Sequence, residues 1–157
     1  KLFSDPKNSF KAIFFGALIV VVLSFVCTYI VRSLGISGTD PNSESVITLM
    51  ESEKTVMLVI TVLLAPFVEE LLFRGGIFCA LYEKGRLTAY VITVLLFSLY
   101  HVWQSAFASG DIRYLLYALA YIPPSVALCY VYEKSDCIAL GIIFHMGYNL
   151  AAQLISR

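Results

Sequence analysis

Long apolar runs separated by short polar stretches make up most of the chain. They lie at residues 12–31, 55–82, 87–108, 114–132 and 137–155. A helix of about 20 apolar residues, rising about 1.5 Å per residue, crosses the roughly 30 Å hydrocarbon core of a bilayer. The pattern predicts an all-α fold, a polytopic membrane helical bundle of about five transmembrane helices.

Interruptions in this pattern suggest how the chain is organised. Residues 32–54 are polar and carry Gly35, Gly38 and Pro41, which predicts an extramembrane loop. Pro66 predicts a kink or a restart in the second run, and Pro123 with the next proline predicts a break in the fourth. We expect residues 1–54 to form an N-terminal transmembrane helix and loop, and residues 55–157 to form the core.

The composition agrees with a membrane protein. Of the 157 residues, 59% are hydrophobic and 14% are charged, against roughly 45–50% and about 25% in soluble domains. Membrane lipid is therefore the expected surrounding. The first run has a rival interpretation as a cleaved signal peptide, but it is longer than the usual apolar region and no A-x-A-like site follows. Net charge is zero without a basic tract, so no nucleic-acid partner is expected.

The four cysteines all lie in apolar segments and lack C-x-x-C spacing, so we expect buried, inert thiols rather than a disulfide framework. Cys79 is the nearest candidate for a nucleophile because it follows a charged stretch.

That charged stretch, "VEELLFRGG" at residues 68–76, places ionisable groups where lipid would be the solvent. Such groups cost at least about 2.5–3.5 kcal/mol at the bilayer centre, so they usually face the bundle interior. Further polar groups lie at similar depth in later runs, and the full set is Glu69, Glu70, Arg74, His101, His145 and Asn149.

Helical spacing sorts these groups. Glu70 and Arg74 are four residues apart, so they share a helix face and can form an ion pair. Glu69 points about 100° away and has no partner in its own helix. The same spacing places Asn149 beside His145, and Phe97 beside His101.

Together these groups supply the parts of a hydrolase that activates water. A carboxylate and a histidine can hold and deprotonate water, and a second histidine with an asparagine can donate to an oxyanion. Interhelical hydrogen bonding without catalysis is the plainer alternative. Zinc on Glu69, His101 and His145 is possible, although H-E-x-x-H is absent. A serine hydrolase lacks a motif, and a proton-coupled transporter lacks the repeat typical of that class.

Three motifs in order resemble a known family. Glu69-Glu70-x-x-x-Arg74, Phe97-x-x-x-His101 and His145-x-x-x-Asn149 look like the signature motifs of the CPBP family, the CAAX-protease and bacteriocin-processing intramembrane proteases, also called the ABI family. The resemblance extends over about residues 55–155. It implies an intramembrane endopeptidase acting on a membrane-associated peptide or prenylated protein.

The resemblance also implies roles for single residues. Glu69 and His101 would activate water, His145 and Asn149 would form the oxyanion hole, and Glu70, Arg74 and Phe97 would support the site. A glutamate mechanism without a cofactor is favoured, with zinc as the alternative. A non-catalytic protein that gives bacteriocin self-immunity is the second function to consider. The compact size resembles bacterial members, so we expect a bacterial cell membrane.

Overall fold

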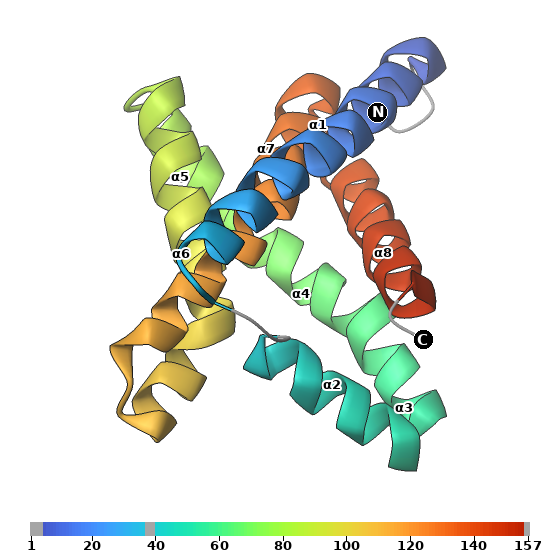
Figure 1. Ribbon diagram of the computed structural model, residues 1–157. Helices are drawn as coiled ribbons and strands as arrows, with labels where there is room; N and C mark the ends of the chain where they lie inside the picture. Colours follow the sequence, from blue (N-terminus) through green and yellow to red (C-terminus); the bar gives the residue numbers. More distant parts are fainter. Residues whose placement is uncertain (1–4, 37–39, 156–157) are drawn as a thin grey trace.

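The computed structural model describes residues 5–36 and 40–155, and these residues form helices joined by short turns (Figure 1). One long helix, Lys54–Tyr82, alternates α-helical and π-helical geometry. In chain order the elements are α1 (Pro6–Ser33), α2 (Pro41–Ser52), α3 (Lys54–Leu58), a π-helical segment (Val59–Leu64), α4 (Ala65–Glu70), a second π-helical segment (Leu71–Phe78), α5 (Cys79–Tyr82), α6 (Arg86–Ser109), a 3-10 helix (Ile112–Ala120), α7 (Ile122–Ser135) and α8 (Ile138–Ile155).

Four of these helices are long and apolar enough to cross a membrane. They are α1, the helix Lys54–Tyr82, α6 and α8; the 3-10 helix and α7, bent by 46°, can form a fifth span. Large apolar side chains point outward from the bundle, such as Phe25 (75% exposed) and Leu87 (78% exposed). An apolar exterior suits lipid as the solvent, so the predicted membrane bundle is confirmed.

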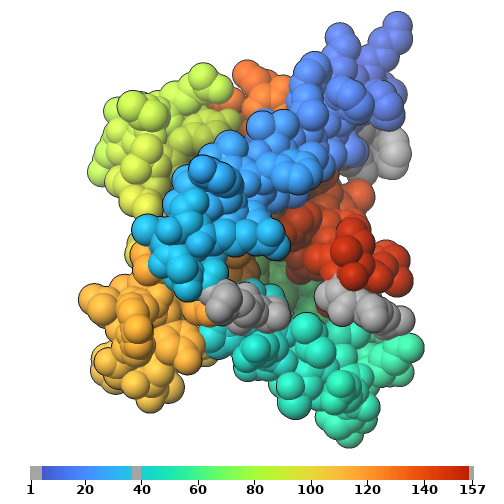
Figure 2. All heavy atoms as spheres, viewed as in Figure 1, coloured from blue at the N-terminus to red at the C-terminus, as the bar shows by residue number. Residues whose placement is uncertain are grey.

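Helix α1 packs along α7 and crosses the face of the molecule seen in Figures 1 and 2. Ala12 of α1 joins Val131 and Leu140 in a buried apolar cluster. A Cβ atom on Gly16 would lie 2.6 Å from the Cγ2 atom of Val131. The close approach of the two helices therefore depends on glycine at this position.

The prediction of a loop over residues 32–54 is wrong for residues 41–52, which form helix α2, and residues 37–39 of that stretch lie outside the described residues. The Asp40 side chain caps this helix by accepting a hydrogen bond from the backbone N–H of Ser43 (3.0 Å), and Pro41 occupies its first turn. Helix α2 buries no residue and lies at the edge of the molecule, on the side where α1 ends (Figure 2).

The helix Lys54–Tyr82 continues through Pro66 without the predicted restart. The π-helical segment Val59–Leu64 lies just ahead of the proline, and there the N–H of Ala65 bonds to the carbonyl of Ile60. Proline has no N–H to give to the next carbonyl. The carbonyl oxygen of Thr61 is therefore left without a helical donor. The N–H of Ala65 is used by Ile60, and Pro66 has no N–H.

The predicted break in the fourth run is confirmed, and it falls at Tyr121, where the 3-10 helix ends and α7 begins. Pro123 and Pro124 then lie in the first turn of α7, where the missing N–H groups would have no helical partner. Serine follows at position 125, buried in the bundle interior. The break thus places Tyr121 and Ser125 toward the centre of the protein.

Candidate active site

A cavity of about 540 Å³ lies between the helices, and all four predicted reactive side chains line it. Its walls come from α2, the helix Lys54–Tyr82, α6, the break before α7, and α8. The polar residues at its surface include Asp40, Asn42, Thr61, Glu69, His101, Tyr121, His145, Asn149 and Gln153. Segments up to about a hundred residues apart in sequence thus converge on one space.

Glu70 is fully buried and is hydrogen-bonded to one residue of its own helix and one of α8. Its Oε1 atom accepts a hydrogen bond from Arg74 Nη1 (2.9 Å), as the spacing of the two residues predicts, and another from His145 Nδ1 (2.9 Å). The second oxygen, Oε2, has no hydrogen-bond partner among the described residues and lies 3.4 Å from where a Cβ atom on Gly141 would be. Glu70 therefore connects the helix Lys54–Tyr82 to α8.

Arg74 extends this cluster to a third helix. Its Nη2 atom donates to the carbonyl and to the hydroxyl of Ser125, both at 3.1 Å. The guanidinium carbon also lies 4.6 Å from the centre of the Phe97 ring, a cation–π contact with α6. A buried arginine needs such partners, because an unpaired charge in this environment is strongly unfavourable.

Glu69 has a different environment from its neighbour. Its Oε2 atom lies 3.8 Å from His101 Nε2 and 3.8 Å from His145 Nε2. These distances exceed the 2.7–3.2 Å range of hydrogen bonds between nitrogen and oxygen. The Glu69 side chain is 14% exposed and faces the cavity. The carboxylate therefore stands between two imidazoles without bonding to either.

The partners of each histidine fix its tautomer. His101 Nδ1 lies 2.8 Å from the carbonyl of Phe97, which can only accept, so Nδ1 carries the proton. His145 Nδ1 donates to the carboxylate of Glu70 in the same way. In the neutral form of each ring, Nε2 is then an acceptor facing Glu69. Three acceptors converge here, an arrangement suited to a molecule that can donate, such as water.

Asn149 lies on the same wall as His145. Its Nδ2 atom donates to the carbonyl of Thr61 (2.8 Å), the oxygen that Pro66 leaves without a backbone donor. The Thr61 hydroxyl bonds to the carbonyl of Met57 (2.7 Å) and accepts from Gln153. One hydrogen of the Asn149 amide thus serves the backbone, and the amide has a second.

Several residues of the site were missed in the sequence analysis. Ser125 binds Arg74, Gly141 makes room for Glu70, and Tyr121 stacks on His101 with ring centres 4.3 Å apart. Asp40 accepts a hydrogen bond from the Tyr121 hydroxyl. The Asp40-Pro41 pair, a common start of a helix, was the one signal that could have indicated this part of the site.

The structure also bears on the metal and cysteine alternatives. No group of three or more His, Cys, Asp or Glu residues in the described part of the chain is arranged to hold a metal ion. Cys79 is exposed, so burial was wrongly predicted for it, and its Sγ atom lies 2.9 Å from the Tyr132 hydroxyl. Cys79 is not among the residues that line the cavity.

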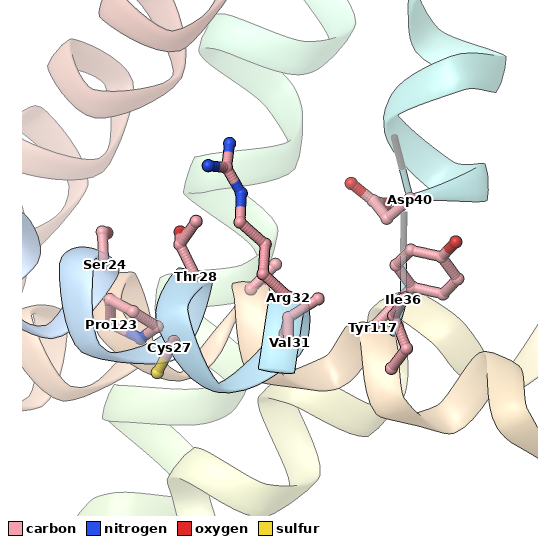
Figure 3. Close-up of a pocket in the computed structure, with 10 residues that line it drawn as sticks. Ser24, Cys27, Thr28, Val31, Arg32, Ile36, Asp40, Tyr117 and Pro123 are labelled. Atoms are coloured by element: carbon pink, nitrogen blue, oxygen red, sulfur yellow. The ribbon is translucent and has the colours of Figure 1, made fainter. Parts of the chain in front are cut away.

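A second cavity of about 490 Å³ adjoins the end of α1. Figure 3 shows the Arg32 side chain extending away from α1 into this space, with Asp40 and Tyr117 across from it. Asp40 lines both cavities, which places the start of α2 between them.

The fold and the site together define a polytopic helical membrane protein with a polar site enclosed by its helices. Comparison with known families is consistent with this class: the family model described as "Type II CAAX prenyl endopeptidase Rce1-like" matches residues 51–151. The chain belongs to this Rce1-like family, and the resemblance drawn from the three motifs is confirmed. The matched region contains every residue of those motifs.

The chain is also similar to the UPF0177 protein YvdC of Lactococcus lactis subsp. lactis (strain IL1403). The two are 25% identical over 156 residues, which cover 96% of this chain and 56% of the relative. The chain thus spans little more than half the length of that protein. No solved structure matches the chain.

Proposed function

We propose that this chain is an intramembrane endopeptidase in which Glu69 and His101 activate the water that attacks a peptide bond. The observation that carries the proposal is the position of the Glu69 carboxylate, 3.8 Å from the Nε2 atoms of His101 and His145 and open to the cavity. A water seated against Glu69 and His101 can donate one hydrogen to each of these acceptors. Such a water is held with its oxygen free to face a substrate carbonyl.

The reaction then follows from these positions. Glu69 takes a proton from the water, and the water oxygen bonds to the carbonyl carbon of the substrate. The carbonyl oxygen becomes an oxyanion. As the C–N bond breaks, the departing nitrogen takes the proton back from Glu69. One product ends in a carboxyl group and the other begins with an amine, so atoms and protons balance.

We assign stabilisation of the oxyanion to His145 and Asn149, which line the same cavity. The Asn149 amide has one hydrogen beyond the one that it gives to Thr61. His145 already donates from Nδ1 to Glu70, so it can donate to substrate only from a protonated Nε2. No step of this mechanism passes through a metal ion.

For the substrate, we propose a membrane-associated peptide, either a CAAX-type prenylated protein or a bacteriocin or signal peptide. The first class follows from the family description, which is that of a CAAX prenyl endopeptidase. The cavity supports either class, since its walls combine polar groups with Val46, Ile47 and Met50 of α2. The related protein from Lactococcus supports a bacterial cell membrane as its location.

The test is cleavage of membrane-anchored peptides, with and without a prenyl group, by purified protein in detergent. Wild type is compared with Glu69→Gln, which keeps the size of the side chain but cannot take a proton. Glu83→Gln is the matched control, because Glu83 is an exposed acid in the turn before α6. Each reaction is run with and without a chelator.

We expect cleavage by wild type and by Glu83→Gln, with the chelator present or absent, and cleavage about 1,000-fold slower by Glu69→Gln. Cleavage that requires the prenyl group selects the CAAX class of substrate. Loss of activity on chelation would replace the glutamate mechanism with a metal-dependent one. Folded wild type that binds these peptides without cutting them would favour the self-immunity function instead.

A further inference from the structure

Tyr121 holds an unusual position, at the break between the 3-10 helix and α7 and against the His101 ring. The two rings stack with centres 4.3 Å apart and planes 23° from parallel. Phe97 also contacts the His101 ring, at 4.6 Å between ring centres, and its carbonyl accepts from Nδ1. The imidazole is thus held by one hydrogen bond at Nδ1 and by aromatic contacts.

The Tyr121 hydroxyl is itself held from the other side of the cavity. It donates to Asp40 Oδ1 at 2.5 Å, within the range of an O–H group that donates to a carboxylate, and accepts from Asn42 Nδ2 at 3.1 Å. Asp40 also caps α2 through the N–H of Ser43. A continuous set of contacts therefore runs from the start of α2 to the imidazole.

This connection starts at α2, at the edge of the molecule (Figure 2). Helix α2 buries no residue of its own, and Asp40 lines both cavities; Figure 3 shows it beside the second one. The hydrogen bonds of Tyr121 with Asp40 and with Asn42 tie the start of α2 to the tyrosine ring. Movement at the start of α2 would therefore reach the face of the His101 ring.

We infer that Tyr121 is a positioning residue for His101 and that Asp40 acts through Tyr121, so that a docked α2 keeps Nε2 of His101 directed at Glu69. The inference rests on the proposed function, in which this nitrogen and Glu69 hold the attacking water. Neither Tyr121 nor Asp40 takes part in the chemistry. Their role is to restrict rotation of the imidazole, which orients the water.

Kinetics of a graded set of variants test this role. Tyr121→Phe keeps the stacked ring and loses the hydrogen bond to Asp40, so kcat should fall about tenfold. Tyr121→Leu removes the stack as well, and kcat should fall about 100-fold. KM should stay within about twofold of wild type in both, because substrate binding is not the step that a misplaced imidazole affects.

A double-variant cycle tests whether Asp40 acts through Tyr121. Asp40→Ala alone should lower kcat about as much as Tyr121→Phe, and the double variant should be no slower than either. Asp111→Ala is the control for loss of a capping aspartate, since Asp111 caps the 3-10 helix and accepts from the N–H of Arg113. Tyr114→Phe is the control for loss of a tyrosine hydroxyl on the same 3-10 helix. Both controls should keep the kcat of wild type.

A second measurement does not depend on activity. Diethyl pyrocarbonate modifies imidazole nitrogens, and the chain has two histidines, so mass spectrometry can follow each one separately. In folded protein, Tyr121→Leu should speed modification of His101 about tenfold relative to His145, because the freed ring turns toward solvent. Tyr121→Phe should change the ratio less, and Tyr114→Phe should not change it.

The outcomes separate this inference from the proposed function. An unchanged kcat in Tyr121→Leu, a loss confined to KM, or additive losses in the double-variant cycle would overturn it. If wild type cleaves no peptide, the proposed function fails and the modification ratio alone decides. A His101 ratio that rises in Tyr121→Leu upholds the positioning role, and an unchanged ratio refutes it.

Discussion

Glu69 and Glu70 are neighbours in the chain, yet the protein surrounds them differently. Glu70 is fully buried and accepts hydrogen bonds from Arg74 and His145 on one oxygen. Glu69 faces the cavity and is 3.8 Å from both histidines, too far for a hydrogen bond. A polar group at membrane depth that is closely paired can hold helices together, whereas one that is left open to a cavity can react with what enters it.

The difference originates in helix geometry. Consecutive residues point about 100° apart, so one carboxylate faces Arg74 one turn away while the other faces α6 and the cavity. The paired cluster spans three helices through Glu70, Arg74, Ser125 and His145. It fixes the helix that carries Glu69, so the open carboxylate can be held in place without partners of its own.

The largest expected effect comes from exchanging each acid for its amide. Glu69→Gln should lower kcat about 1,000-fold, within the range attributed to a general base, and leave stability unchanged. Glu70→Gln should act mainly on stability, since its amide lacks the negative charge that pairs with the buried Arg74. Thermal unfolding in detergent and cleavage rates measured on the same samples check both. Equal losses of activity and stability in the two variants would remove the distinction between the acids.

Arg74→Ala should have the next largest effect, on folding. It leaves Glu70 buried with one donor fewer, and breaking a buried pair costs about 3–5 kcal/mol. Arg113→Ala is the control, because Arg113 pairs with Asp111 at an exposed site and should matter little. Unfolding by denaturant in mixed micelles gives the comparison. An Arg74→Ala protein as stable as wild type would show that the paired cluster does not hold the bundle.

His145 contacts both acids, so its two nitrogens can be tested separately. An asparagine places its amide near the position of Nδ1 and a glutamine near that of Nε2. His145→Asn should retain the bond to Glu70 and most of the stability, but lower kcat about 100-fold by removing a donor to the oxyanion. His145→Gln should show the smaller loss of kcat and the larger loss of stability. The reverse ranking would assign the oxyanion to another donor.

The sequence predicts the features of this protein that depend on local spacing. Apolar runs locate the spans, and the four-residue spacing pairs Glu70 with Arg74 and Phe97 with His101. Helix α2 was missed because its apolar residues, such as Val46, Ile47 and Met50, form a run too short to mark a helix, and only Asp40-Pro41 signals its start. In the sequence, Pro66 also looks like an interruption. In the structure the helix continues past it, because the π-helical segment Val59–Leu64 lies just ahead of the proline.

Contacts between distant segments could not be predicted in the same way. Ser125 is 51 residues from Arg74, and Tyr121 is 81 residues from Asp40. Their pairing depends on how the helices cross, which no local pattern specifies. The roles of Glu69, His101, His145 and Asn149 stay predictions, although the structure brings all four to one cavity.

The smallest expected effect tests whether Asn149 belongs with the paired groups or with the open ones. Asn149→Leu leaves the Thr61 carbonyl without a donor, which should cost about 1–3 kcal/mol of stability. Pro66 causes this need, because it supplies no N–H to the helix.

Pro66→Ala restores that N–H. The double variant Asn149→Leu with Pro66→Ala, compared with Pro66→Ala alone, should therefore regain most of the stability that Asn149→Leu loses. If stability returns and cleavage does not, Asn149 serves the oxyanion as well as the helix. If stability and cleavage both return, the role of Asn149 is structural. A double variant no more stable than Asn149→Leu would show that the Thr61 carbonyl does not need the Asn149 donor.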